Sequence, residues 1–199
     1  MTEGTRTDHT PAVRRLQMLT ITWMCVELIV ALISGIQARS IALTAFAGDS
    51  AVELLSAILV LMRFRLGPGV EARAARVNAM LLYVLAGYVI LTSALSLATD
   101  RLKPKPSPIG IGLLVAAAMI MPILGFAKRR LARKTGSGAL RADAAQSSIC
   151  AYMSWIALAG LILNATLHLS WADSVAALLL LPLIFREANE ARKGEICEC

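Results

Sequence analysis

Apolar residues along this chain gather into six long stretches, which short polar segments separate. The stretches lie near residues 19–36, 41–62, 77–98, 109–127, 140–163 and 171–184. A helix needs roughly 20 apolar residues to cross the ~30 Å hydrocarbon core of a bilayer, and each stretch is about that long. The pattern therefore predicts an all-α membrane protein with six transmembrane helices.

The polar segments predict how the rest of the chain is organised. We expect an N-terminal tail over residues 1–16, a six-helix transmembrane domain over 17–186, and a short C-terminal tail over 187–199 that ends in Cys197-Glu198-Cys199. The first apolar stretch is longer than the core of a typical secretory signal, so we expect it in the mature protein. The alternating charges of residues 186–195 predict a solvated extension of the last helix.

Two connections have distinctive compositions. Residues 100–108 contain three prolines and predict an extended connection, because proline lacks an N–H and restricts its neighbour. Residues 128–138 are basic and then rich in Gly and Ser, and they predict a loop that anchors the inner side of the membrane. Binding of anionic lipid headgroups is the alternative function for that loop.

Composition supports the membrane prediction and excludes other classes. Apolar residues make up 57% of the chain and charged residues 17%, which is more apolar material than a soluble domain needs. The net charge of +7 comes from basic residues between the apolar stretches, with few aromatic residues beside them. Nucleic-acid binding is therefore not expected.

The distribution of Lys and Arg predicts the orientation. Sixteen of the 20 basic residues fall on one side of the six-stretch layout, and an excess of Lys and Arg marks the cytoplasmic side. We therefore expect a multi-pass protein of the cell (inner) membrane with both termini in the cytoplasm.

Residues 42–53 and 139–150 resemble each other. Both segments share alanines, a leucine and polar positions at the same spacing, and Asp49 and Glu53 correspond to Gln146 and Cys150. The two segments open the second and fifth stretches, which run in opposite directions. The match suggests two three-helix halves related by inverted topology, with a binding site at their interface. Chance similarity between alanine-rich segments is the alternative.

Ionisable residues inside these stretches are few, and each is costly in a bilayer. Asp49 and Glu53 lie four residues apart on one face of the second helix, and Asp143, Gln146 and Cys150 share one face of the fifth. Carboxylates with a thiol can bind a borderline-soft divalent ion. We therefore predict a metal site formed by these five residues.

Depth along the two antiparallel helices places these residues relative to one another. At a rise of about 1.5 Å per residue, Asp49 should lie level with Cys150 and Glu53 level with Gln146. Asp143 should lie roughly 10 Å nearer the cytoplasm, at the inner entrance of the site. For Gln146, hydrogen bonding across a tight helix pair is an equally good interpretation. Two carboxylates four residues apart, by contrast, repel each other unless a cation or protons join them.

Other polar residues leave alternatives open. Glu27 could line the site or relay protons, or it could pair with a neighbouring helix. Asp173 opens the last stretch, where a capping role leads over a binding role. Cys197 and Cys199 could capture a soft metal, although this spacing alone is a weak signal. No nucleotide-binding, hydrolase or haem motif occurs in the chain, so we expect neither an enzyme nor an ATP-driven pump, and no prosthetic group.

Three segments resemble the cation diffusion facilitator family of proton-coupled metal exporters. They are SIALTAFAGDSAVELLSAILVL in the second stretch, ALRADAAQSSICAYMS in the fifth, and WADSVAALLLLPLIFREANEARKG in the sixth. The family's D-x-x-x-D pair corresponds to Asp49 and Glu53, and its H-x-x-x-D pair to Gln146 and Cys150. The departure in the second pair favours Zn²⁺ or Cd²⁺ over Mg²⁺ or Mn²⁺. The sequence ends soon after the sixth stretch, as expected of a short form without the family's cytoplasmic domain.

The resemblance implies a homodimeric secondary transporter that exports a divalent metal ion in exchange for protons. Zn²⁺ is the favoured substrate, with Cd²⁺ or another soft or borderline ion as the alternative. Import rather than export is a further alternative. The competing class is a non-transporting membrane sensor or accessory subunit that uses the tail thiols.

Overall fold

The computed structural model describes residues 10–66, 71–99, 104–136 and 138–193. Six α-helices make up this part of the chain: α1 (Thr10–Ala38), α2 (Ile41–Leu66), α3 (Glu71–Ala98), α4 (Pro108–Thr135), α5 (Gly138–Leu167) and α6 (Ser170–Lys193). Five of them, α1 to α5, are long and apolar enough to cross a membrane. The prediction of an all-α membrane protein with six helices is confirmed, and a membrane-spanning role for α6 remains a prediction.

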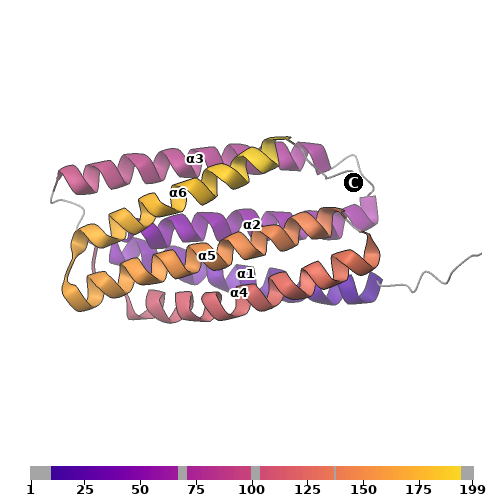
Figure 1. Ribbon diagram of the computed structural model, residues 1–199, viewed down its shortest axis with the longest axis horizontal. Coiled ribbons are helices and arrows are strands. Elements are labelled where there is room, and N and C mark those ends of the chain that lie inside the picture. The colour runs from indigo at the N-terminus through magenta and orange to yellow at the C-terminus, as the bar shows by residue number, and fades with distance from the viewer. Residues whose placement is uncertain (1–9, 67–70, 100–103, 137, 194–199) are drawn as a thin grey trace, which may run out of the picture.

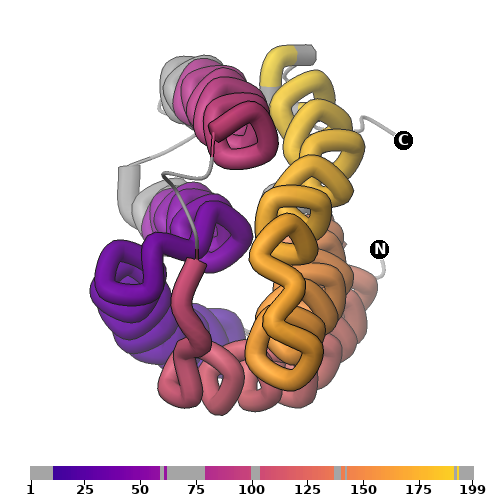
Figure 2. The backbone as a smooth tube through the Cα atoms, turned by 90° about the vertical axis from the view of Figure 1, so that its left-hand side faces the viewer, coloured from indigo at the N-terminus to yellow at the C-terminus, as the bar shows by residue number. Residues whose placement is uncertain are grey.

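The helices pack side by side in three pairs. Figure 1 shows α3 and α6 on one side of the bundle, α1 and α4 on the other, and α2 and α5 between them; the end-on view in Figure 2 agrees. Contacts join α1 to α2 as they join α4 to α5, and contacts also pair α1 with α4, α2 with α5 and α3 with α6. Two halves related by a two-fold axis would produce these pairings. The inverted repeat itself stays a prediction.

Small residues let the central helices approach closely. Alanines of both central helices are fully or almost fully buried: Ala42, Ala45 and Ala47 in α2, and Ala144, Ala151 and Ala157 in α5. Gly160 of α5 lies against α6, where an added Cβ would stand 2.4 Å from the Cβ of Ala176. Without a hydrophobic driving force between helices in lipid, such close packing stabilises the bundle. It also brings the polar residues of α2, α5 and α6 together.

The prediction of a loop over residues 128–138 is wrong for most of that segment. Helix α4 continues to Thr135 and ends at Gly136, whose φ of 64° is the left-handed conformation that terminates many helices. Lys and Arg are good helix formers, so a basic segment beyond the apolar stretch extends the helix. The other predicted connection, residues 100–108, is described only from residue 104, and α4 begins at Pro108 after the capping residue Ser107.

Helix α6 also differs from the expectation for the chain's end. It continues through Lys193, as an extension predicts, but the extension is not wholly solvated. Glu187 and Ala188 are buried, whereas Arg186 and Glu190 are exposed and pair at 2.9 Å. One face of this segment packs on the bundle because α6 contacts α2, α3 and α5. The alternating charges gave no sign of which acidic residue faces inward.

Candidate metal site

A network of buried polar side chains runs through the middle of the bundle, and it has two parts. The lysine cluster consists of Lys128, Glu53, Asp143, Ser147 and Gln17. The acidic cluster consists of Asp49, Glu187, Glu27 and Cys150. All of these side chains are buried, and they come from α1, α2, α4, α5 and α6.

The lysine cluster is centred on one ammonium group. Lys128 Nζ lies 3.0 Å from Asp143 Oδ2 and 3.4 Å from Glu53 Oε1, and it donates to Ser147 Oγ at 2.8 Å. Ser147 in turn donates to Glu53, and Gln17 Nε2 donates to Asp143 Oδ2 at 2.8 Å. The cluster thereby joins α1, α2, α4 and α5. Its two carboxylates share a positive charge that belongs to the chain itself.

Glu27 of α1 links this region to α2 and α5. Its carboxyl group accepts hydrogen bonds from Ser50 Oγ at 2.6 Å and from Trp23 Nε1 at 2.7 Å. The Cys150 sulfur lies 3.8 Å from Glu27 Oε1. Of the two alternatives for Glu27, pairing with a neighbouring helix is what the structure displays, and it places this carboxyl group beside the predicted ligand Cys150.

Asp49 and Glu187 form the part of the network with the fewest donors. Their carboxyl groups interact with each other, and both also interact with Glu53. Asp49 also interacts with the thiol of Cys150, and Glu187 with the amide of Gln146. However, none of the four carboxyl oxygens of Asp49 and Glu187 makes a hydrogen bond to a described residue. Buried carboxylates in this arrangement need a cation or protons.

The structure thus brings most of the predicted ligands together. Asp49, Glu53 and Cys150 are fully buried and interact with one another. Gln146 is only half-buried and reaches the group through Glu187. Asp143 interacts with Glu53 and shares Lys128 with it, which fits a position next to the site and not in it.

The side chains as they stand do not form a closed coordination shell. Within the described ranges, no three His, Cys, Asp or Glu groups converge closely enough to hold one ion. Ligation would therefore require the carboxylates to turn toward a common point. The long side chains of Glu53 and Glu187 have the rotamer freedom for such a movement.

Sequence reasoning missed two residues of the network. The sequence pattern predicts Lys128 in a basic loop, but it is fully buried in α4 and forms ion pairs with Glu53 and Asp143. The pattern predicts Glu187 in a solvated extension, but it is 6% exposed. A lysine directly after an apolar stretch is ordinarily a membrane anchor, so only its partners on other helices distinguish it. For Glu187, no local pattern distinguishes it from the charged residues around it.

Asp173 has a capping role, but for a different helix. Its carboxylate accepts hydrogen bonds from Ser40 Oγ at 2.5 Å, from the Ile41 N–H at 2.7 Å and from the Ala42 N–H at 3.4 Å. These groups form the start of α2, so Asp173 satisfies the free N–H groups of α2 from α6. The predicted cap of its own helix is replaced by this contact between helices. Cys197 and Cys199 lie outside the described residues.

The chain is similar in sequence to known proteins. Residues 18–191 match the family model described as the cation efflux transmembrane domain. The chain is also 27% identical over 168 residues to the manganese efflux system protein MneS of Bacillus subtilis, a match that covers 79% of this chain. The chain spans 58% of that relative's length.

Proposed function

The chain belongs to the cation diffusion facilitator family of cation efflux proteins, and on that premise we propose that it exports a divalent transition-metal ion from the cytoplasm in exchange for protons. The observation that carries the proposal is the acidic cluster. Asp49 and Glu187 are buried without donors from the described residues, and Glu53 and Cys150 lie beside them. Of the two partners that could satisfy these carboxylates, a cation or protons, we propose that a divalent cation binds here and that protons replace it.

The donor set supports two choices of metal. The Cys150 thiol favours Zn²⁺ or Cd²⁺, because soft sulfur ligands select these ions. The carboxylates favour harder ions, and the relative MneS is a manganese efflux protein. We propose Zn²⁺ as the principal substrate and Mn²⁺ as the second candidate. The protein needs no prosthetic group for this function, and its family is one of transporters and not of enzymes.

Alternating access around the acidic cluster is the proposed mechanism. Metal ligands must be deprotonated, so protons that enter from outside compete with the ion and release it there. Glu53 belongs to the lysine cluster and also lies next to Asp49. A metal ion that recruits Glu53 therefore competes with Lys128 for the same carboxylate. That competition would loosen the ion pair between α2 and α4 when metal arrives and restore it when metal leaves.

The proposed setting is the cell (inner) membrane, with both termini in the cytoplasm and the protein acting as a homodimer. The excess of basic residues on one side supports this orientation. Helix α3 is the least buried of the five spanning helices, so an apolar surface is available for contacts with lipid or a second copy.

The test is metal uptake into proteoliposomes under an imposed pH gradient, with Zn²⁺, Cd²⁺ and Mn²⁺ offered separately. We expect the intact protein to transport and Asp49→Ala to be inactive. Ser154→Ala is the matched control, since Ser154 is buried but donates to a carbonyl group of its own helix, that of Ala151 at 2.8 Å. Cys150→Ser should shift preference from Cd²⁺ toward Mn²⁺. Transport that ignores the pH gradient would contradict proton coupling.

Absence of any transport by the folded, intact protein would contradict the exporter proposal. The alternative of a membrane metal sensor or accessory subunit would then be tested through Cys197→Ser and Cys199→Ser in cells exposed to metal. A sensor should lose its response in those variants, whereas a transporter should protect cells in a manner that depends on Asp49.

A further inference from the structure

The last turns of α6 contain two acidic residues, Glu187 and Glu190. Glu187 is buried, whereas Glu190 is exposed. Glu187 is 6% exposed and Ala188 is fully buried. Glu190, one turn further along α6, faces outward and pairs with Arg186 at 2.9 Å. The two glutamates thus have different roles. Glu190 has a partner on its own helix, and Glu187 points into the bundle toward α2 and α5.

Among the described residues, the groups that interact with Glu187 are carboxylates and an amide, and none of them is a cation. Glu187 interacts with Asp49, Glu53 and Gln146, and neither of its oxygens meets a donor of the described residues at hydrogen-bonding distance and angle. Lys128, the buried ammonium of the network, pairs instead with Glu53 and Asp143. Asp49 of α2 and Glu187 of α6 therefore present carboxyl groups to each other, and neither group makes a hydrogen bond to a described residue.

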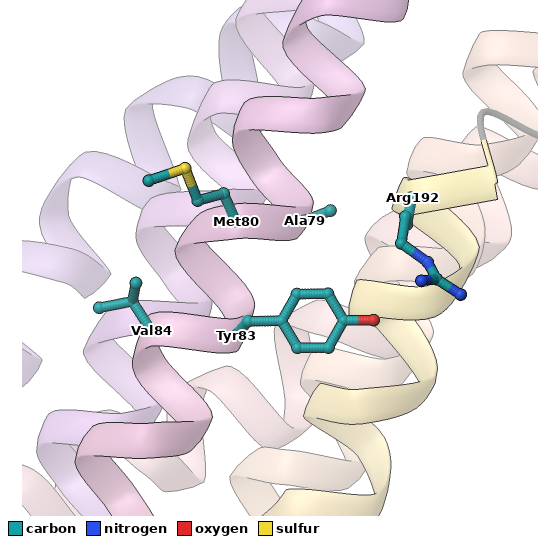
Figure 3. A pocket seen from close by; sticks show the side chains of 5 residues that line it. All are labelled: Ala79, Met80, Tyr83, Val84 and Arg192. Carbon is teal, nitrogen blue, oxygen red and sulfur yellow. The ribbon is translucent and has the colours of Figure 1, made fainter.

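Contacts with α3 hold this part of α6 in place. Tyr83 Oη donates to Asn189 Oδ1 at 2.7 Å, and the Tyr83 ring lies 6.3 Å from the ring of Phe185, centroid to centroid. Figure 3 shows the Tyr83 side chain reaching from α3 toward α6, below Arg192. These contacts flank Glu187 on both sides in the sequence. They join α3 to the turn of α6 that carries Glu187.

We propose that Glu187 is a metal ligand, which α6 contributes to the transport site opposite Cys150 of α5. The inference rests on the proposed function and deepens it, because it adds an oxygen donor to a site that has one soft sulfur donor. Asp49 and Glu187 form the side of the site that suits hard ions such as Mn²⁺, and Cys150 forms the side that suits Cd²⁺ and Zn²⁺. Binding draws the two carboxylates toward one ion and removes their mutual repulsion.

The first test is calorimetric titration of the purified full chain in detergent with MnCl₂ and with CdCl₂. We expect Glu187→Gln to weaken Mn²⁺ binding by at least about tenfold and to weaken Cd²⁺ binding less. Cys150→Ser should show the reverse order. Glu190→Gln is the matched control, since Glu190 lies on the same helix with an exposed partner, and it should bind both ions as the wild type does.

The second test gives a positive signal for direct ligation. Cys150→Ser and the double variant Cys150→Ser/Glu187→Cys are titrated with CdCl₂ while thiolate-to-metal charge-transfer absorption is recorded in the ultraviolet. Direct contact predicts an additional absorption in the double variant, with all other cysteines unchanged. A merely structural role for Glu187 would not place the new sulfur on the ion.

The outcomes separate this inference from the function on which it rests. If the wild type binds and transports metal while Glu187→Gln binds Mn²⁺ unchanged, Glu187 is not a ligand and the exporter proposal stands. A folded double variant without the additional absorption likewise overturns the inference alone. If the wild type binds neither ion, both proposals are wrong.

Discussion

The lysine cluster and the acidic cluster both contain buried Asp and Glu side chains. They differ in whether a cation of the chain lies beside these carboxylates. Lys128 lies between Glu53 and Asp143 and belongs to the chain. For Asp49 and Glu187, no cation of the described residues is among the interacting groups, and none of their oxygens makes a hydrogen bond to a described residue. One cluster carries its own cation, whereas the other needs a cation or protons from solution.

On that difference we base the assignment of a structural role to the lysine cluster and of the proposed transport role to the acidic cluster. The ammonium of Lys128 is tethered to α4, so it cannot leave, and its ion pairs with Asp143 and Glu53 join α4 to its neighbours. A site that must bind and release its cation cannot contain a tethered one. Glu53 belongs to both clusters, since it contacts Lys128 and interacts with Asp49. Charge removal should therefore have opposite consequences for stability in the two clusters.

Loss of the lysine should have the largest effect on stability. Lys128→Met leaves Glu53 and Asp143 buried without their cation, and breaking a buried pair in this way costs about 3–5 kcal/mol. We expect a marked fall in the thermal unfolding midpoint of the purified protein in detergent. Lys134→Met is the matched control, because Lys134 is exposed on the same helix, and its midpoint should stay close to that of the wild type. Equal midpoints for the two variants would contradict a structural role for Lys128.

Neutralising Asp49 should leave stability intact and abolish the response to metal. Asp49→Asn removes a carboxylate that faces Glu187 and Glu53, so the metal-free midpoint should equal or exceed that of the wild type. A saturating metal stabilises the wild type by about 2.7 kcal/mol when its concentration is 100 times Kd, and we expect no such increase in the variant. A variant that unfolds early without metal would make Asp49 a structural residue.

Acidification should weaken metal binding at the acidic cluster. Each proton that must leave a ligand for metal to bind changes the affinity tenfold per pH unit, or about 1.4 kcal/mol. Metal affinity should therefore rise with pH while the ligands still carry protons, and it should fall as acid protonates them. Zn²⁺ titrations over a series of pH values measure this slope. An affinity independent of pH would contradict proton competition at the site.

A smaller effect is expected at the end of the bundle where α2 begins. Asp173→Ala removes the carboxylate that caps the start of α2, and loss of a helix cap costs about 1 kcal/mol. The thermal midpoint should fall modestly. Metal affinity should stay unchanged, because the cap lies about two turns of α2 away from Asp49. Reduced metal affinity would indicate that the cap also positions Asp49.

The helices could be predicted from the sequence because their signal is local. Spanning a bilayer requires long apolar stretches, and the start of α2 at Ile41 and the end of α3 at Ala98 agree with that pattern. The helix ends that carry the basic segments could not be predicted as well. Basic segments continue a helix beyond the membrane as readily as they form loops, which is why α4 extends to Thr135.

The site could be predicted only where a single helix carries the signal. Asp49 and Glu53 stand out because two carboxylates occupy one face of an apolar helix. Lys128 and Glu187 could not be recognised, since each follows an apolar stretch where charged residues usually meet water. Their roles depend on the packing of α4 and α6 against α2 and α5, which no local pattern encodes.

Equilibrium Zn²⁺ binding to Asp49→Asn and Asp143→Asn tests the separation of the two clusters most directly. Both variants replace a buried carboxylate by an amide of the same size, one in each cluster. We predict that Asp49→Asn raises the Kd for Zn²⁺ more than about 100-fold, whereas Asp143→Asn changes it less than about tenfold. If Asp143→Asn weakens binding as much as Asp49→Asn does, the ion binds across both clusters, and the assignment of Lys128 to a separate structural cluster is wrong.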